Sequence, residues 1–359
     1  MLISKFKDVA TESTSLWNSV LATANSSLKN VADKTTFSLK DLVQKITPPS
    51  LVSFACKTAK VLTVSSMLLF GATDLPAQKT LLINSPATWQ ELLNDVASNG
   101  GANNTYILTQ DIGDPGNLST WVERDPQGNP TPYVTQMIGS FNTPFKGTFD
   151  GNGNTVWLNI SSSDAFVGLF SCIGDANVTT NVTIKNLTVR GSIVSAGGHV
   201  AGIVGYALGN LFNTILIQNC TNYVNLSSGS HNGGILGCIQ DSKFISFLNC
   251  VNYGSISGGD HTGGICGHIH SGNGVVVNVI GCSNYGNIVS IGHCADAGGI
   301  IGMIEEVYEE IHSALLDFCF NNGTVAGGKH VGGIVGRIGL PNGYFTCSSL
   351  NPILHIIFI

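Results

Sequence analysis

Short runs of alternating apolar and polar residues fill the second half of the chain, and glycine and asparagine interrupt them. In a typical run, Ile265 follows a glycine pair and Ile269 stands four positions further on. Side chains of a strand alternate between its two faces, so both isoleucines belong to one face. Each repeated segment therefore predicts three short strands separated by Gly, Asn and Ser turns.

The motif Gly-Gly-Ile-Xaa-Gly sets the period of these runs. It occurs at 233–237, 263–267, 298–302 and 332–336, with variants at 201–205 and 167–171. Successive copies are separated by 34, 32, 30, 35 and 34 residues, a spacing typical of solenoids. We predict that the second glycine is structural, at a turn with positive φ or a close contact between coils. These glycines are Gly168, Gly202, Gly234, Gly264, Gly299 and Gly333.

A second block, such as 249–254 with the sequence Asn-Cys-Val-Asn-Tyr-Gly, precedes each glycine pair. If each repeat makes one coil, equivalent residues stack at about 4.8 Å. The fold class we predict is all-β, a right-handed parallel β-helix of about six coils. A propeller blade needs four strands in roughly 40–50 residues, longer than these units. A leucine-rich repeat is excluded because its leucine spacing is absent.

Residues 84–98 are expected to form a helix ahead of the repeats. Ser85 is the predicted N-cap and Pro86 the first helical residue. The apolar face would consist of Trp89, Leu92, Leu93 and Val96. With a strand at 106–108, this helix would cap the N-terminal end of the solenoid.

The segment 57–77 has the features of a secretory signal. Lys57 and Lys60 precede an apolar stretch at 61–72, and Ala77 is the expected cleavage site. The apolar stretch is too short to span a bilayer. The alternative is a buried segment of a cytosolic domain.

The domain organisation that follows has six parts. These are a weakly structured or helical leader (1–56), the signal-like segment (57–77), the cap (78–112), the first coils with a long loop (113–165), the glycine-rich repeats (166–338) and an apolar tail (339–359). The long loop, at 112–143, is either a binding loop or a surface decoration. The tail lacks the polar character of a capping repeat, which indicates a truncated reading frame or self-association through the C-terminal edge.

The repeats resemble the GLUG-type glycine-rich repeats of secreted and cell-surface proteins. The resemblance covers roughly residues 82 to 338. It rests on the glycine motif, on the introductory segment 145–156 and on Phe166-Val167-Gly168-Leu169-Phe170. It implies a surface β-helix of the adhesin or stalk kind. No activity is transferred, because fold analogy alone does not carry function.

Charge narrows the range of partners. Only 11% of the residues are charged, and 43% are hydrophobic. Residues 1–77 carry eight lysines and five acids, whereas residues 78–359 carry eight basic and 17 acidic residues. An acidic rod lacking clusters of Lys and Arg is a poor nucleic-acid binder, so we expect no nucleic-acid partner.

Histidine recurs three positions before the second glycine. Asp296 takes this place in the fifth copy and Ala165 in the first. On a solenoid the imidazoles would form a column that binds a ligand, a metal or protons. The simpler interpretation is a turn residue with local hydrogen bonds. The candidate binding residues are His199, His231, His261 and His330.

Cysteine also recurs in equivalent places, and these residues are predicted to be structural. Stacked cysteines are either compact apolar fillers with free thiols or, in an exported protein, disulfide-bonded. Their spacings match no zinc signature. The four residues are Cys220, Cys250, Cys282 and Cys319.

Catalytic chemistry has little support in the sequence. A polysaccharide-degrading enzyme on this scaffold needs carboxylates gathered on one face, and no acidic column recurs. The acidic cluster at 305–310 is interpreted as a solvated insertion. The segment Asp150–Asn154 resembles a calcium loop but lacks its later ligands, so a tight Asn-Gly turn is expected.

We therefore predict a non-enzymatic, secreted or surface-displayed repeat protein. It would act in adhesion or ligand binding, with a host or cell-surface glycan or protein as partner. No catalytic residue, cofactor or metal site is predicted. The alternatives are a carbohydrate-active β-helix enzyme, a polysaccharide lyase or hydrolase, and a structural stalk for a missing domain.

Overall fold

The computed structural model describes most of the chain from Gln78 onward. The described ranges are 78–116, 123–124, 130–210, 213–227, 229–241, 244–271, 276–306, 313–339 and 344–348. They belong to one compact unit, Pro76–Ile359. The predicted leader and signal-like segment lie outside the described residues. In the described ranges, no helix is both long and apolar enough to cross a membrane.

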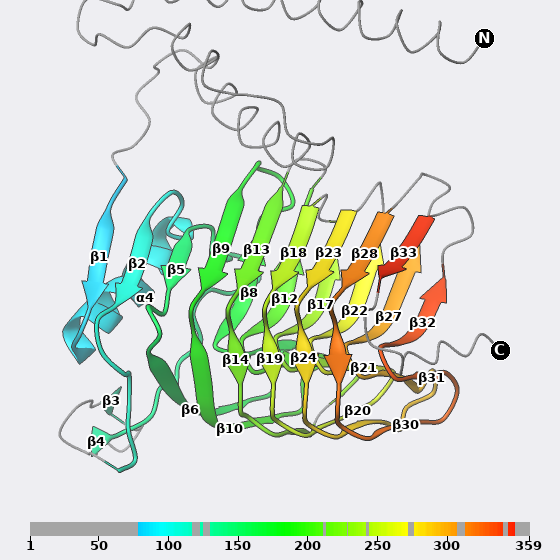
Figure 1. The fold of residues 1–359 in the computed structure, drawn as a ribbon. Coiled ribbons are helices and arrows are strands. Elements are labelled where there is room, and N and C mark those ends of the chain that lie inside the picture. Colours follow the sequence, from blue (N-terminus) through cyan, green and yellow to red (C-terminus); the bar gives the residue numbers. More distant parts are fainter. Residues whose placement is uncertain are drawn as a thin grey trace, which may run out of the picture. The chain divides into compact units, whose positions relative to one another are not determined.

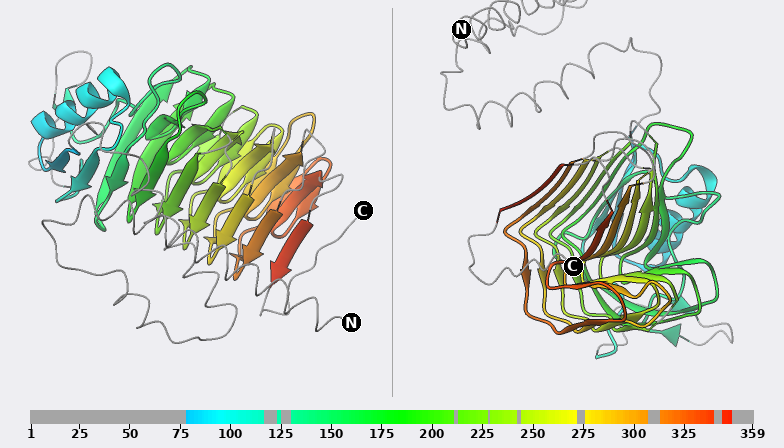
Figure 2. Two further views of the ribbon diagram at one scale, coloured as in Figure 1. Left: turned by 90° about the horizontal axis from the view of Figure 1, so that it is seen from above. Right: turned by 90° about the vertical axis from the view of Figure 1, so that its right-hand side faces the viewer.

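The described residues form the parallel β-solenoid that the sequence predicts, with about five turns rather than about six (Figure 1). Seen along its axis, successive coils superimpose (Figure 2). A complete coil contains five short strands, not the three expected, because the asparagine and glycine corners divide the chain more finely. We number the resulting sheets 1 to 5 in the order in which a coil visits them.

Sheet 1 contains nine strands and forms the longest side of the solenoid. Its strands are β1 (Thr80–Ile83), β2 (Thr105–Leu108), β5 (Thr148–Asp150), β9 (Asn181–Lys185), β13 (Thr214–Gln218), β18 (Phe244–Leu248), β23 (Val276–Ile280), β28 (Ser313–Asp317) and β33 (Tyr344–Ser348). Strand β33 shows that part of the predicted apolar tail extends this sheet.

Sheets 2 and 3 follow the asparagine corner. Sheet 2 contains β6 (Thr155–Ser162), β10 (Thr188–Ser195), β14 (Thr221–Asn222), β19 (Val251–Asn252), β24 (Ser283–Asn284) and β29 (Phe320–Asn321). Sheet 3 contains β15 (Leu226–Ser227), β20 (Ile256–Gly258), β25 (Ile288–Ser290) and β30 (Val325–Gly327).

Sheets 4 and 5 flank the glycine motif. Sheet 4 contains β7 (Phe166–Val167), β11 (His199–Ala201), β16 (His231–Gly233), β21 (His261–Gly263), β26 (Asp296–Gly298) and β31 (Val331–Gly332). Sheet 5 contains β8 (Phe170–Gly174), β12 (Val204–Leu208), β17 (Leu236–Gln240), β22 (Cys266–Ser271), β27 (Ile301–Glu306) and β32 (Val335–Gly339).

The predicted cap at the N-terminal end of the solenoid contains the predicted helix, α4 (Pro86–Asn99). Ser85 caps it in a reciprocal arrangement with Thr88, and Gly100 ends it with φ of 79°. The helix lies at the β1 end of the solenoid and buries its apolar face (Figure 2). The predicted helix, its N-cap Ser85 and its first residue Pro86 are confirmed.

The long insertion after this cap contributes to the solenoid interior. Ile112, Val134 and Ile138 are buried, and each forms a parallel bridge to the following coil. A short antiparallel pair, β3 (Glu123–Arg124) and β4 (Pro130–Thr131), lies between them. The region is thus an irregular first coil rather than only a surface loop.

The Asn-Gly turn near the start of the repeats is also confirmed. Asn152 and Gly153 both have positive φ, and Asn154 N–H donates to Gly151 O at 2.8 Å. Positive φ at both central positions defines a type I′ turn. It forms the corner between sheets 1 and 2.

Buried asparagines explain the repeated Asn-Cys block. In the copy at 249–254, Asn249 makes a corner with φ of 52°, and Cys250 points into the core. Asn252 is fully buried; its Nδ2 donates to Gly254 O at 2.8 Å and to the next coil's Asn284 at 2.7 Å. Tyr253 is exposed. The same amide ladder continues through Asn222, Asn252, Asn284 and Asn321.

The equivalent cysteines line the core beside this ladder. Cys220, Cys250 and Cys282 are buried and Cys319 is half-buried; all four thiols are free. Burial raises the pKa of Cys250 well above its ordinary value. In this structure the four cysteines are free thiols packed in or beside the core.

In four of the six motifs the second glycine packs against the asparagine ladder; these are Gly202, Gly234, Gly264 and Gly299. A Cβ on Gly264 would lie 2.6 Å from Asn284 Cγ and closer still to Gly299 O. Its φ is not positive, so of the two predicted reasons the close contact is the correct one. Gly333, in the last coil, has no atom within 4 Å of its Cβ position.

Gly264→Ala should therefore destabilise the solenoid by about 1–3 kcal/mol, the usual cost of overpacking. Gly333→Ala, the matched control, should change the free energy of unfolding by less than about 0.5 kcal/mol. Urea unfolding followed by circular dichroism measures both. Equal midpoints for the two variants would contradict the close contact.

Asn252→Ala should cost about 1–3 kcal/mol, because it removes the buried hydrogen bonds that Asn252 makes with Asn222 Nδ2 and Asn284 Oδ1. Asn321→Ala should cost less, since Asn321 is half-buried and is the last member of the ladder described. The same unfolding measurement applies. A larger loss for Asn321→Ala than for Asn252→Ala would be inconsistent with the ladder.

Candidate functional site

A column of histidines runs along sheet 4. In-register pairing places His199 beside His231 and His231 beside His261. Their ring centroids are 4.6 and 4.9 Å apart, and the rings are nearly parallel. The structure thus confirms that these three histidines stack in the predicted column. In the first coil its neighbour is Phe166, not Ala165, because β7 pairs one residue later than the glycine spacing suggests.

Sheet 5 brings a second set of side chains against this column. A Cβ on Gly267 would lie 2.6 Å from Asn232 N, so strand β22 touches strand β16 of the preceding coil. The residues next to this contact, His231 and His268, therefore meet, with centroids 4.8 Å apart. The ring centroid of His268 is also 4.6 Å from that of His261. Because Gly267 has no side chain, strands β22 and β16 can approach closely, and this brings the histidines together.

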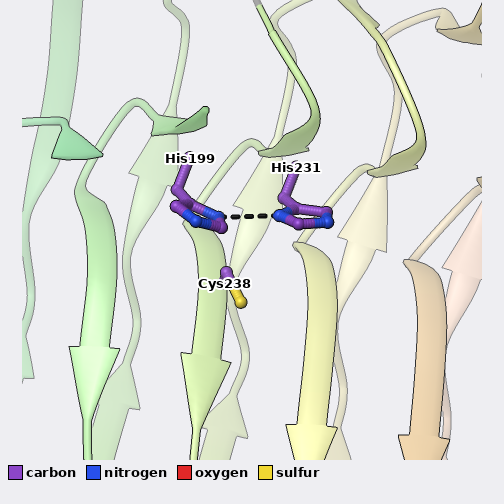
Figure 3. A group of neighbouring side chains, drawn as sticks. All are labelled: His199, His231 and Cys238. Atoms are coloured by element: carbon purple, nitrogen blue, oxygen red, sulfur yellow. Dashed lines mark hydrogen bonds between the residues drawn. The ribbon is translucent and has the colours of Figure 1, made fainter. Parts of the chain in front are cut away.

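Cys238 lies between the two sets. Its Sγ is 3.9 Å from His268 Nδ1 in the next coil. His199 and His231 contact one another through their Nδ1 atoms at 2.7 Å, and Figure 3 shows these rings side by side near Cys238. Burial raises the pKa of Cys238 well above its ordinary value.

Two carboxylates border the cluster. Asp296, which is fully buried, lies 3.0 Å from His261 and 2.6 Å from His330, measured from carboxylate oxygen to Nδ1. Burial by itself raises the pKa of Asp296, but both histidines hold it below its ordinary value. Glu305 Oε2 lies 3.0 Å from His268 Nε2, and this hydrogen bond lowers the pKa of Glu305.

This position of Glu305 corrects the interpretation of the acidic cluster. Glu305 belongs to strand β27 and pairs with a buried histidine, so it is not part of a solvated insertion. The strand continues because Met303 and Glu305 keep the alternation of sheet 5, pairing with His268 and His270. The acids at 309 and 310 lie outside the described residues.

Burial favours the neutral imidazole at three histidines, His199, His231 and His268. Burial lowers the pKa of His199 to about 4 and that of His231 to about 2, and the nearby His268 adds to both effects. Burial also lowers the pKa of His268, against the opposing effect of Glu305. A neutral imidazole keeps one nitrogen lone pair, which is what a metal ion requires.

Of the predicted candidates, His199, His231 and His261 lie together. His330 joins only through Asp296, and 42% of its side chain is exposed. Sequence reasoning missed Cys238, His268 and Glu305. The available signal was Gly-His-Ile-His at 267–270, because strand alternation places both histidines on the face opposite Ile269.

A second candidate surface, the tyrosine ladder, lies on sheet 2. It consists of Tyr223, Tyr253 and Tyr285, whose rings stack at 4.8 and 5.0 Å. They are 37%, 45% and 43% exposed, far more than a core aromatic. The Arg190 guanidinium lies 3.8 Å from the Tyr223 ring centroid, a cation–π contact that extends the ladder.

Comparisons with known proteins show partial similarity to large surface proteins. No family model matches the chain, so the GLUG resemblance is not identified as a family relationship. Halomucin of Haloquadratum walsbyi is 31% identical over 143 residues, 39% of this chain and 1% of halomucin. Outer membrane protein B of Rickettsia conorii is 28% identical over 173 residues, 45% of this chain and 10% of that protein.

Among solved structures, one match is a Bacteroides ovatus protein provisionally named as an immunoglobulin A1 protease. It is 20% identical, with a TM-score of 0.45, covering 77% of this chain and 78% of that one. Similarity at this level is evidence of neither a shared fold nor a shared activity. The chain is thus a β-solenoid repeat protein that resembles surface proteins over part of its length.

Proposed function

We propose that this chain is a non-enzymatic, surface-displayed or secreted solenoid that binds a glycan through the tyrosine ladder. The single observation carrying this proposal is that Tyr223, Tyr253 and Tyr285 stack in register yet stay about two-fifths exposed. Exposed tyrosines offer an apolar ring and a hydroxyl together, a combination common at binding surfaces. Their in-register array suits a polymer lying along the solenoid.

Charge favours a neutral polysaccharide as the ligand. Residues 78–359 carry 17 acidic and eight basic residues, which disfavours an acidic polymer. At the ladder itself, Arg190 already stacks on Tyr223. A protein partner on the same surface, and nucleic acid, are the less favoured ligands.

A binding role is also supported over an enzymatic one by the placement of carboxylates. Asp296 is fully buried and held between two histidines. Glu305 is engaged by His268. Neither is a free acid or base beside the tyrosine ladder, where a bound polymer would lie.

The triple variant Tyr223→Ala, Tyr253→Ala, Tyr285→Ala should bind neutral polysaccharides at least about tenfold more weakly, a loss of roughly 1.4 kcal/mol. Affinity electrophoresis against neutral and acidic polysaccharides measures this. Ile291→Ala, at a residue 76% exposed outside the ladder, is the matched control and should bind normally.

Unchanged binding by the triple variant would refute the role of the ladder. Exclusive binding of an acidic polymer would refute the neutral-glycan assignment. Release of oligosaccharides during the same incubation would contradict the non-enzymatic role and favour a carbohydrate-active enzyme.

Surface display or secretion is supported by the signal-like segment 57–77 and by the partial similarity to an outer membrane protein. We expect the mature protein from native cells to begin at Gln78, after cleavage at Ala77. Mass spectrometry of its N-terminus tests this. An intact cytosolic chain starting at Met1 would contradict export.

A further inference from the structure

The buried histidine cluster has the arrangement of a metal site. We propose that His231, His261 and His268 bind one divalent transition-metal ion of the zinc class, with Cys238 as the fourth ligand. One ligand atom from each of the three imidazoles lies within 4.8 Å of the other two. Cys238 stands in the same relation to His199 and His231. The proposal is independent of the tyrosine ladder.

Two of the three histidines each have a carboxylate beside one ring nitrogen. His261 Nδ1 lies 3.0 Å from Asp296 Oδ2, and His268 Nε2 lies 3.0 Å from Glu305 Oε2. Metal-binding histidines typically donate their second ring N–H to a carboxylate or carbonyl, which fixes the tautomer. This arrangement leaves His261 Nε2 and His268 Nδ1 for the ion.

His231 follows the same rule with a different partner. Its Nδ1 lies 2.7 Å from His199 Nδ1, so His199 can accept the Nδ1 proton of His231. His231 Nε2 then remains for the ion. His199 is therefore a positioning residue. The Sγ of Cys238 lies 3.9 Å from His268 Nδ1, which makes this thiol the candidate for the fourth ligand.

The buried His261–Asp296 pair is also unsatisfied in the absence of an ion. His261 Nδ1 and Asp296 Oδ2 are buried, and neither has a hydrogen-bond partner in the described structure, although they are 3.0 Å apart. His261 is only 7% exposed and Asp296 is fully buried. A small rotation of His261 toward an ion would align its N–H with the carboxylate, and the cation would offset the buried negative charge.

The spacing and the donor types favour a zinc-class ion. Zinc–nitrogen bonds of about 2.1 Å place tetrahedral ligand nitrogens roughly 3.4 Å apart. Closing a pair of ligand atoms from 4.8 Å to this spacing requires each to move by less than about an ångström. Imidazole and thiolate donors select Zn²⁺, Co²⁺ or a similar ion over Mg²⁺ and Ca²⁺, which prefer oxygen.

The experiment titrates Co²⁺ into the full chain after removal of metal with a chelator, and then displaces it with Zn²⁺. We expect one ion per chain, with the visible absorption of tetrahedral Co²⁺ and a thiolate charge-transfer band. His261→Gln and His268→Gln should abolish stoichiometric binding. Cys238→Ser should lose the charge-transfer band and bind the ion more weakly, because one direct ligand is removed.

Two further variants distinguish residues that bind the ion directly from residues that do not. His199→Gln should weaken binding roughly tenfold while keeping the tetrahedral spectrum, as expected for a residue acting through a ligand. His293→Gln, at an exposed histidine outside the cluster, is the matched control and should bind as the wild type does. X-ray absorption of the Zn²⁺-loaded wild type should show imidazole and sulfur ligands.

Equal binding by wild type, His261→Gln and His268→Gln would overturn the proposal. Loss of binding in His199→Gln but not in His261→Gln would shift the site to the other triad and refute the assignment. If the variants fail to fold, the X-ray absorption measurement on the wild type decides. The absence of imidazole ligands there would refute the site.

Discussion

The close approach of neighbouring backbones at the glycine motif is the constraint on which the rest of this structure depends. A Cβ on Gly264 would collide with the asparagine ladder and with Gly299 O. One on Gly267 would collide with the backbone of Asn232 in the preceding coil. The motif glycines therefore serve by their lack of a side chain, whereas the corners with positive φ are made by residues outside the motif, such as Asn249 and Gly281. Because the ladder amides pair only in register, these two features together fix how each coil sits on the next.

In-register stacking turns a weak sequence repeat into two continuous surfaces. Once Asn222 Nδ2 donates to Asn252 Oδ1, the following residues, Tyr223 and Tyr253, must stack on the outside. Once Gly267 touches Asn232, the adjoining His231 and His268 must meet beside it. Neither the tyrosine ladder nor the histidine cluster needs a dedicated loop. Both surfaces follow from the same coil geometry. At the stacked positions the chain carries tyrosine, histidine and cysteine, which are residue types able to bind ligands.

The fold was largely accessible from the sequence because its signals are local and repeated. The period of the glycine motif, the alternation around Ile265 and Ile269, and the caps of helix 84–98 each predicted a feature that the structure contains. The number of strands per coil was missed, since two-residue strands such as β14 leave too little alternation to detect. The role of the second glycines was left open between two reasons, and only packing between coils distinguishes them.

The histidine cluster shows where sequence reasoning stops. Equivalent positions predicted the column of His199, His231 and His261, because residues at one place in the repeat stack. His268 and Cys238 belong to a different strand of the coil, and their approach depends on how sheet 5 folds against sheet 4 of the preceding coil. No spacing along the chain encodes that distance. Glu305 was misplaced for the same reason, since its partner lies in another coil.

Deleting one coil tests the central claim, in-register stacking, most directly. Removal of residues 220–249 joins Asn219 to Cys250, the position equivalent to Cys220, and preserves every ladder. The account predicts a folded, protease-resistant protein with an unchanged β-sheet circular dichroism spectrum per residue. Removal of residues 235–249 breaks the register and should give an unfolded or aggregated chain. If both deletions fold equally well, or if the one-coil deletion alone fails, the stacking described here is contradicted.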